Sequence, residues 1–132
     1  MITEDYVSFE TAKLLKEKGF DTECDYLYAD GKLVRAHGYA CNWNDGETLF
    51  ADYKNECSAP TLQMAMKWLR VRHHIDINVR TYYLNYLKPN DTRYYSGKIL
   101  KGSEDVIHTI YSKDTYEEVC EAAIKYGLEN LI

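Results

Sequence analysis

The feature that most constrains this fold is residues 58–79, where a helical pattern changes into a strand pattern without an intervening turn. Ser58 is a suitable N-cap and Pro60 suits a first helical turn, so the sequence predicts a helix beginning there. Apolar residues then recur at helical spacing, at Leu62, Ala65, Met66 and Leu69, with Met64, Trp68 and Val71 widening the stripe. Immediately afterwards Ile75, Ile77 and Val79 alternate with polar residues, as in a half-buried strand. A helix this apolar is expected at the centre of the fold.

Capping and turn signals define the other elements. A first helix is expected from the Ser8 cap to Gly19, and a last helix from the capping box of Thr115 and Glu118. Asp30-Gly31 predicts a type I′ turn within a hairpin. The predicted strands are 24–29, 32–37, one from residue 75 with a bulge or a strand end near 81–83, 94–100 and 105–111. A turn is expected at 88–91, and 38–57 gives no clear prediction.

These elements predict an α+β fold. Short connections favour antiparallel pairing, so the expected architecture is an antiparallel sheet, a hairpin plus a three-stranded meander, with three helices packed mainly on one face. At 132 residues the chain suits a single domain, 1–132.

Composition predicts a cytoplasmic protein with no membrane association. No apolar run approaches the length of a membrane span, and the first residues lack the basic and apolar regions of a signal peptide. Four scattered cysteines, Cys24, Cys41, Cys57 and Cys120, are therefore expected to be reduced.

Residues 6–20, 58–70 and 115–132 resemble a family of small uncharacterised proteins associated with phages and mobile elements of gut anaerobic bacteria. The resemblance covers the three predicted helices, whereas the intervening strands match less well. It implies a phage-like origin, and it carries no known activity, so no functional residue is transferred from it.

The sequence predicts no catalytic, cofactor-binding or metal-binding residues. The cysteines and histidines lack the close-spaced pairs typical of zinc sites, and no glycine-rich phosphate loop occurs. Cys57 precedes a predicted helix, where a thiol pKa can fall, and an enzyme would be favoured if Cys57 were exposed within reach of His37 or His108. We therefore expect a non-enzymatic protein.

The main functional candidate is a basic, tyrosine-rich segment at residues 67–101. Residues 66–101 carry eight basic and two acidic side chains in a chain of net charge −5 with 13 tyrosines. The candidate surface comprises Lys67, Arg70, His74, Arg80, Tyr82, Tyr83, Tyr86, Arg93, Tyr94, Tyr95 and Lys98.

Two functions fit this surface. The first is an accessory or interaction protein that binds an unknown protein partner, or a second copy as a homodimer, through tyrosines, which are enriched at interfaces. The alternative is a nucleic-acid-binding module, in which cations meet phosphates and tyrosines stack on bases. Tyrosines that simply pack a half-buried sheet against helices would explain the same pattern without binding.

Overall fold

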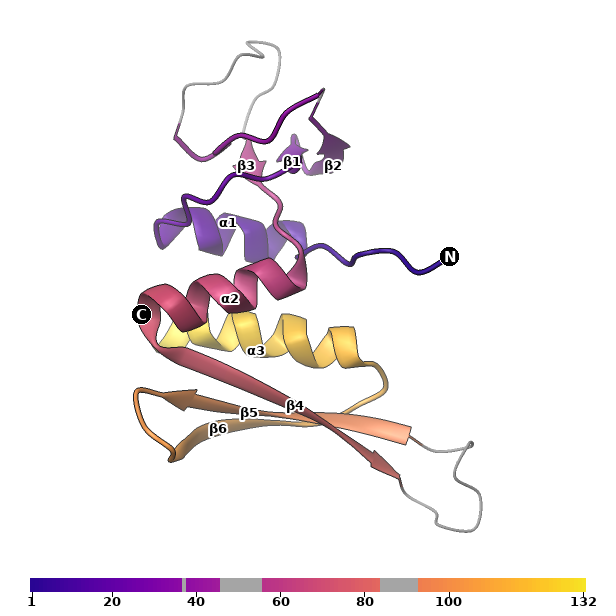
Figure 1. Cartoon of the computed structure of the whole chain (residues 1–132), viewed down its shortest axis with the longest axis vertical. Coiled ribbons are helices and arrows are strands. Elements are labelled where there is room, and N and C mark those ends of the chain that lie inside the picture. Colours follow the sequence, from indigo (N-terminus) through magenta and orange to yellow (C-terminus); the bar gives the residue numbers. More distant parts are fainter. Residues whose placement is uncertain (37, 46–55, 84–92) are drawn as a thin grey trace. The chain divides into compact units, whose positions relative to one another are not determined.

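The computed structural model describes residues 1–36, 38–45, 56–83 and 93–132. The elements, shown in Figure 1, are α1 (Phe9–Glu17), β1 (Tyr26–Ala29), β2 (Lys32–Arg35), β3 (Cys57–Ser58), α2 (Leu62–His73), β4 (Ile75–Tyr83), β5 (Arg93–Lys101), β6 (Val106–Lys113) and α3 (Tyr116–Asn130). The α+β class is as predicted. The chain divides into two compact units, residues 1–65 and 66–132, with the boundary inside α2. Whether they behave as the predicted single domain stays a prediction.

Helix α1 follows the predicted capping pattern. The Ser8 side chain accepts a hydrogen bond from the Thr11 amide at 3.2 Å. Gly19 has φ +90° just after the helix, a conformation that glycine adopts without steric cost. Ala12 and Leu15 are on the buried side of this helix.

The first unit contains a three-stranded sheet of order β2-β1-β3. Strands β1 and β2 form the predicted hairpin, in which Asp30 (φ 51°) and Gly31 (φ 80°) have the positive φ values of a type I′ turn. The strands are shorter than predicted, and His37 lies outside the described residues. Strand β3 pairs with β1 through Leu27↔Ser58 and Tyr28↔Cys57.

The predicted N-cap of the central helix is wrong. Ser58 belongs to β3, and α2 begins at Leu62, where the Thr61 hydroxyl accepts the Met64 amide at 3.1 Å. The Ser58 hydroxyl instead accepts the Trp43 amide at 3.0 Å. A serine hydroxyl can accept a hydrogen bond from a helix N-terminus or from a loop amide. Because Ser58 pairs with β1, its hydroxyl accepts from the loop amide here.

Residues 38–45 pack into the core of the first unit through Trp43. Its side chain is 2% exposed, and its indole Nε1 donates to the Cys24 carbonyl at 2.8 Å. Beside it, the Asn44 side chain donates to the Phe20 carbonyl and accepts the Ser58 amide, both at 2.9 Å. This segment is therefore part of the core structure of the unit.

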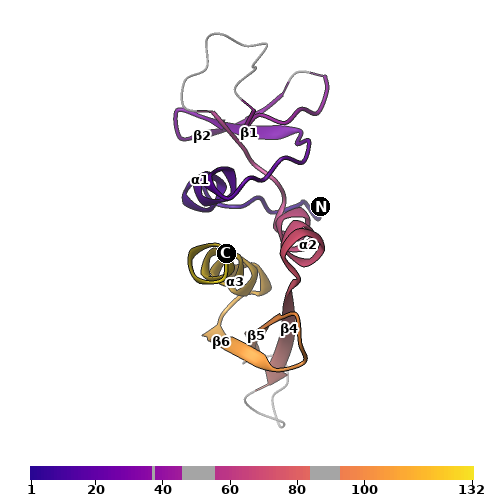
Figure 2. The same ribbon diagram turned by 90° about the vertical axis from the view of Figure 1, so that its left-hand side faces the viewer.

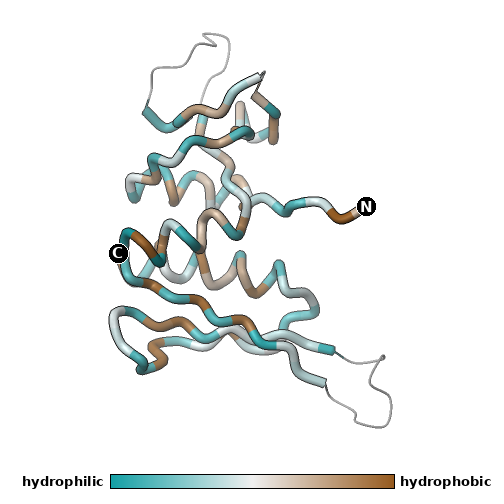
Figure 3. Tube along the Cα trace, viewed as in Figure 1, coloured by the Kyte–Doolittle hydropathy of each residue, from teal (hydrophilic) through white to brown (hydrophobic). Residues whose placement is uncertain are grey.

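The second unit is built on the sheet β4-β5-β6, the predicted meander. The pairing of β4 with β5 is regular from Ile75↔Lys101 to Tyr83↔Arg93, so there is no bulge at 81–83, and β4 as described ends at Tyr83, in agreement with the alternative prediction of a strand end there. The irregularities lie between β5 and β6 instead. Figure 3 shows the alternation of hydrophobic and hydrophilic residues along β4 that the sequence predicts. The predicted turn at 88–91 lies outside the described residues.

Helix α3 covers one face of this sheet (Figure 2). The Thr115 hydroxyl accepts the Glu118 amide at 3.1 Å, which confirms the predicted cap. The closest approach is at Gly97 of β5, where an ideal Cβ would lie 2.6 Å from Cγ1 of Val119. At Gly127 of α3, by contrast, the atoms nearest to an ideal Cβ are an ordinary 3.8 Å away.

The junction between α2 and β4 is a single residue, His74. It has φ 55°, in the left-handed region where glycine is usual, and its carbonyl accepts the Gly102 amide at 3.0 Å. His74 is thus the point at which the chain leaves the helix and enters the strand.

The single predicted sheet is wrong in one respect, because the hairpin and the meander belong to separate three-stranded sheets. Strand β3, which pairs with β1, is itself only two residues long, too short for a periodic signal in the sequence. Over the ranges described, no helix is long and apolar enough to cross a membrane.

Candidate functional site

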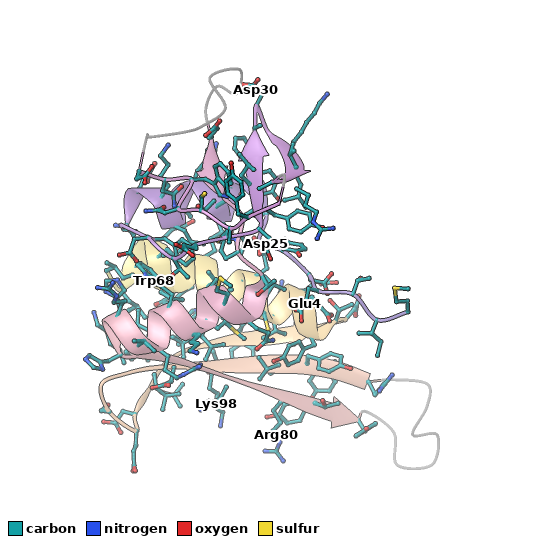
Figure 4. The ribbon with its side chains drawn as sticks, turned by 45° about the horizontal axis from the view of Figure 1, so that its top comes forward. Glu4, Asp25, Asp30, Trp68, Arg80 and Lys98 are labelled. Atoms are coloured by element: carbon teal, nitrogen blue, oxygen red, sulfur yellow. The ribbon has the colours of Figure 1, made fainter. Side chains whose placement is uncertain are left out.

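The sheet β4-β5-β6 has one face covered by α3 and one open face. Strand alternation places Asn78, Arg80 and Tyr82 on the same face, and their partners on β5 are Lys98, Ser96 and Tyr94. The opposite face carries the buried Ile75 and Ile99. Figure 4 shows Arg80 and Lys98 extending from the side of the sheet away from α3.

The open face contains a groove of about 390 Å³, here called the tyrosine groove. It is lined by residues of all three strands: Asn78, Val79, Arg80, Tyr82, Tyr94, Ser96, Lys98, Thr109 and Tyr111. All of these residues belong to the second unit, so the geometry of the groove depends only on how β4, β5 and β6 are paired.

Aromatic and cationic groups are layered in the tyrosine groove. The Tyr82 and Tyr94 rings stack across the strands with centroids 5.1 Å apart and an interplanar angle of 14°. The Arg80 guanidinium lies 5.0 Å from the centroid of the Tyr82 ring. This cation–π contact holds the guanidinium beside the aromatic pair while leaving its N–H groups able to donate.

The tyrosine groove is positively charged although the chain is acidic. Arg80 and Lys98 are both exposed, and none of the residues described as lining the groove is a carboxylate. The chain as a whole has a net charge of −5. The groove therefore favours an anionic group next to a planar or apolar one.

Four of the predicted surface residues meet in this groove: Arg80, Tyr82, Tyr94 and Lys98. The structure places the others elsewhere. By strand alternation, the opposite face of the sheet carries Tyr83, Arg93 and Tyr95. The Tyr95 ring packs edge-on against Tyr116 of α3, with 6.4 Å between the ring centroids. Three lie along or just after α2: Lys67, Arg70 and His74. Tyr86 lies outside the described residues. The predicted surface as a whole is thus not one site.

The sequence prediction missed Tyr111, Thr109, Ser96 and Asn78. Tyr111 is 73% exposed, the most exposed of the groove tyrosines. Thr109 pairs with Lys98, and simple alternation along β6 would place Tyr111 on the same face as Thr109. The register shifts between β5 and β6 interrupt this alternation, so the sequence alone does not assign Tyr111 to a face.

Cys57 does not have the environment of a nucleophile. Its side chain is 1% exposed, and burial raises the pKa of the thiol, an effect that the charges of Lys16 and Lys13 only partly oppose. His37, one of its two proposed partners, lies outside the described residues. Within the parts of the chain that the structure describes, no group of three histidine, cysteine or acidic side chains is arranged to hold a metal ion.

Comparison with known proteins adds no assignment. No protein-family model, curated protein or solved structure matches the chain. The resemblance of its three helices to phage-associated proteins therefore stays a prediction.

Proposed function

We propose that the chain is a non-enzymatic accessory protein that binds single-stranded nucleic acid in the tyrosine groove. The observation that carries this proposal is the meeting of Arg80, Lys98 and the stacked pair Tyr82–Tyr94 on one open sheet face without a lining carboxylate. The resemblance to phage-associated proteins supports an accessory role in a phage or mobile element.

Each part of the groove corresponds to one part of a nucleotide. Arg80 and Lys98 are placed to meet phosphates, and the tyrosine rings provide planar surfaces for bases. Bases reach such rings only when they are unstacked from a duplex, so single strands are the expected ligand. Because the rest of the chain is acidic, we expect weak binding that is highly sensitive to salt.

Fluorescence anisotropy with labelled oligothymidylate and oligouridylate tests the proposal. The double variant Arg80→Ala/Lys98→Ala is expected to weaken binding and to lower the slope of log affinity against log salt by about 1.4, for two lost phosphate contacts. Tyr94→Ala is expected to cost about 1–3 kcal/mol of binding free energy. Titrations at about 50 and 200 mM salt give the slope.

The matched control is Lys67→Ala/Arg70→Ala, which removes the same charge from exposed positions of α2 outside the groove. It should leave the affinity almost unchanged. The proposal fails if the wild-type protein does not bind either oligonucleotide at low salt, or if the control weakens binding as much as the groove variant.

A protein partner or a second copy is the second candidate, favoured by a different observation. In the sheet as described, β6 is an edge strand, and it exposes Val106 (45%), Ile107 (44%) and Tyr111. Exposed apolar side chains on a strand edge favour pairing with another chain.

Light scattering tests this second candidate through the oligomeric state. A homodimer that Ile107→Lys converts to monomer would support self-association through β6. The exposed Thr81→Lys on β4 adds the same charge to the other edge strand and should leave the dimer intact. A wild-type monomer at all concentrations would exclude self-association.

A further inference from the structure

The first unit contains a cavity of about 560 Å³ between α1 and the turn that joins β1 to β2. Helix α1 contributes Phe9, Lys13, Lys16 and Glu17, the turn contributes Asp30, and Glu56 comes from the residue before β3. Figure 4 shows Asp30 at the tip of the hairpin. The cavity is therefore lined by both basic and acidic side chains and by the aromatic ring of Phe9.

Glu56 is the unusual group in this cavity. Its side chain is only 6% exposed, and neither carboxylate oxygen has a hydrogen-bond partner in the structure as described. Buried carboxylates are ordinarily paired, because losing hydration without compensation is costly. Glu56 lines the cavity, but both oxygens are covered, so a hydrogen-bond donor in the cavity reaches this unpartnered acceptor pair when the side chain turns toward it.

The two lysines of the cavity do not satisfy this carboxylate. The Lys16 ammonium donates at 2.8 Å to the backbone carbonyl of Glu56. The Lys13 ammonium lies over the Phe9 ring, 4.7 Å from its centroid. Both lysines thus keep N–H groups with which to bind an anionic group.

The electrostatics agree with this geometry. Burial raises the pKa of the Glu56 carboxyl, and the Lys16 charge opposes this shift. A bound cation would favour the ionised carboxylate, whereas the two lysines would repel a ligand that carried positive charge alone. A ligand with both charges fits the cavity better than either a simple cation or a simple anion.

We propose that this cavity binds a small zwitterion of the α-amino-acid type. The ligand ammonium donates to the Glu56 carboxylate, its carboxylate accepts from Lys13 or Lys16, and its side chain packs on Phe9. The site is separate from the tyrosine groove and does not depend on the nucleic-acid proposal.

Thermal-shift measurements on the full chain, with each of the common free amino acids at millimolar concentration, should identify at least one that raises Tm. Isothermal titration then gives its affinity. The N-acetyl and methyl-ester forms of that amino acid, which lack the ammonium and the carboxylate respectively, should each bind at least about tenfold more weakly.

Glu56→Gln should weaken binding by about tenfold or more, because the amide does not provide the charged acceptor. The same variant should unfold at a higher temperature without ligand at neutral pH, since it removes a buried unpartnered charge. The control Glu23→Gln changes an exposed carboxylate of the same unit outside the cavity and should have neither effect.

The proposal is overturned if no amino acid raises the Tm of the wild-type chain, or if Glu56→Gln binds as tightly as wild type. Equal binding of the N-acetyl form would also overturn it. The measurements with free amino acids and their N-acetyl and methyl-ester forms use only wild-type protein. They therefore test the proposal even if Glu56→Gln does not fold.

Discussion

Trp43→Ala is expected to lower the free energy of unfolding of the first unit by about 3–5 kcal/mol. The indole is almost fully buried, and its Nε1 donates to the Cys24 carbonyl. Cys24 also forms an isolated bridge with Cys41, with amide-to-carbonyl distances of 2.9 and 3.2 Å. Removing the ring therefore leaves both a cavity and a buried carbonyl without its partner.

Urea unfolding followed by circular dichroism measures this loss. Trp43→Phe, which retains most of the volume but not the N–H, should cost less than Trp43→Ala. The other tryptophan, Trp68, belongs to residues 66–132, so its fluorescence in Trp43→Ala reports on the second unit. An unchanged Trp68 transition would mean that the units unfold separately, whereas a shifted one would support the predicted single domain. A total loss below about 1 kcal/mol would contradict the structural role of Trp43.

Gly97→Val should destabilise the second unit by about 3 kcal/mol, the upper end of overpacking effects. Valine is ordinarily favourable in a strand, so the sign of the effect depends on the contact with α3. A Cβ at this position would lie 2.6 Å from Cγ1 of Val119, closer than side-chain atoms pack. Valine is short and branched, so Val119 has little freedom to move aside.

A double-mutant cycle with Gly97→Ala and Val119→Ala tests this cause. Val119→Ala alone removes two methyl groups from the core, but it should recover part of the stability in the Gly97→Ala background, with a coupling of about 0.5–3 kcal/mol. Thr81→Val, an exposed change on the neighbouring strand, should be nearly neutral. Additive effects of the two alanine substitutions would show that the close approach at Gly97 is not the cause.

The sequence predicts those elements whose signals are local. The Ser8 and Thr115 caps each satisfy an amide three residues away, and the Asp30-Gly31 turn requires only its own backbone angles. Ser58 carries the same chemistry as Ser8, but it pairs with Leu27, which lies 31 residues earlier in the chain. No local pattern encodes that pairing, and this is why both the helix start and the division into two sheets were mispredicted.

The candidate site illustrates the same limit. Charge and tyrosine content indicate the segment that contributes most of the groove residues, but this segment includes both faces of each strand and one side of a helix. Register then separates Tyr82 and Tyr94 from Tyr83 and Tyr95. The cavity at Glu56 was not predicted because its walls come from three parts of the chain far apart in sequence.

The one-residue link at His74 has a consequence for how this chain can vary. Helix α2 repeats every 3.6 residues and β4 every two, and with no loop between them the end of the helix sets the phase of the strand. Adding or deleting one residue here would exchange the two faces of β4, placing Arg80 and Tyr82 against α3 and Ile75 and Ile77 in solvent. The length of this link is therefore fixed, and its positive φ limits the residue to those that tolerate the left-handed region, such as glycine or asparagine.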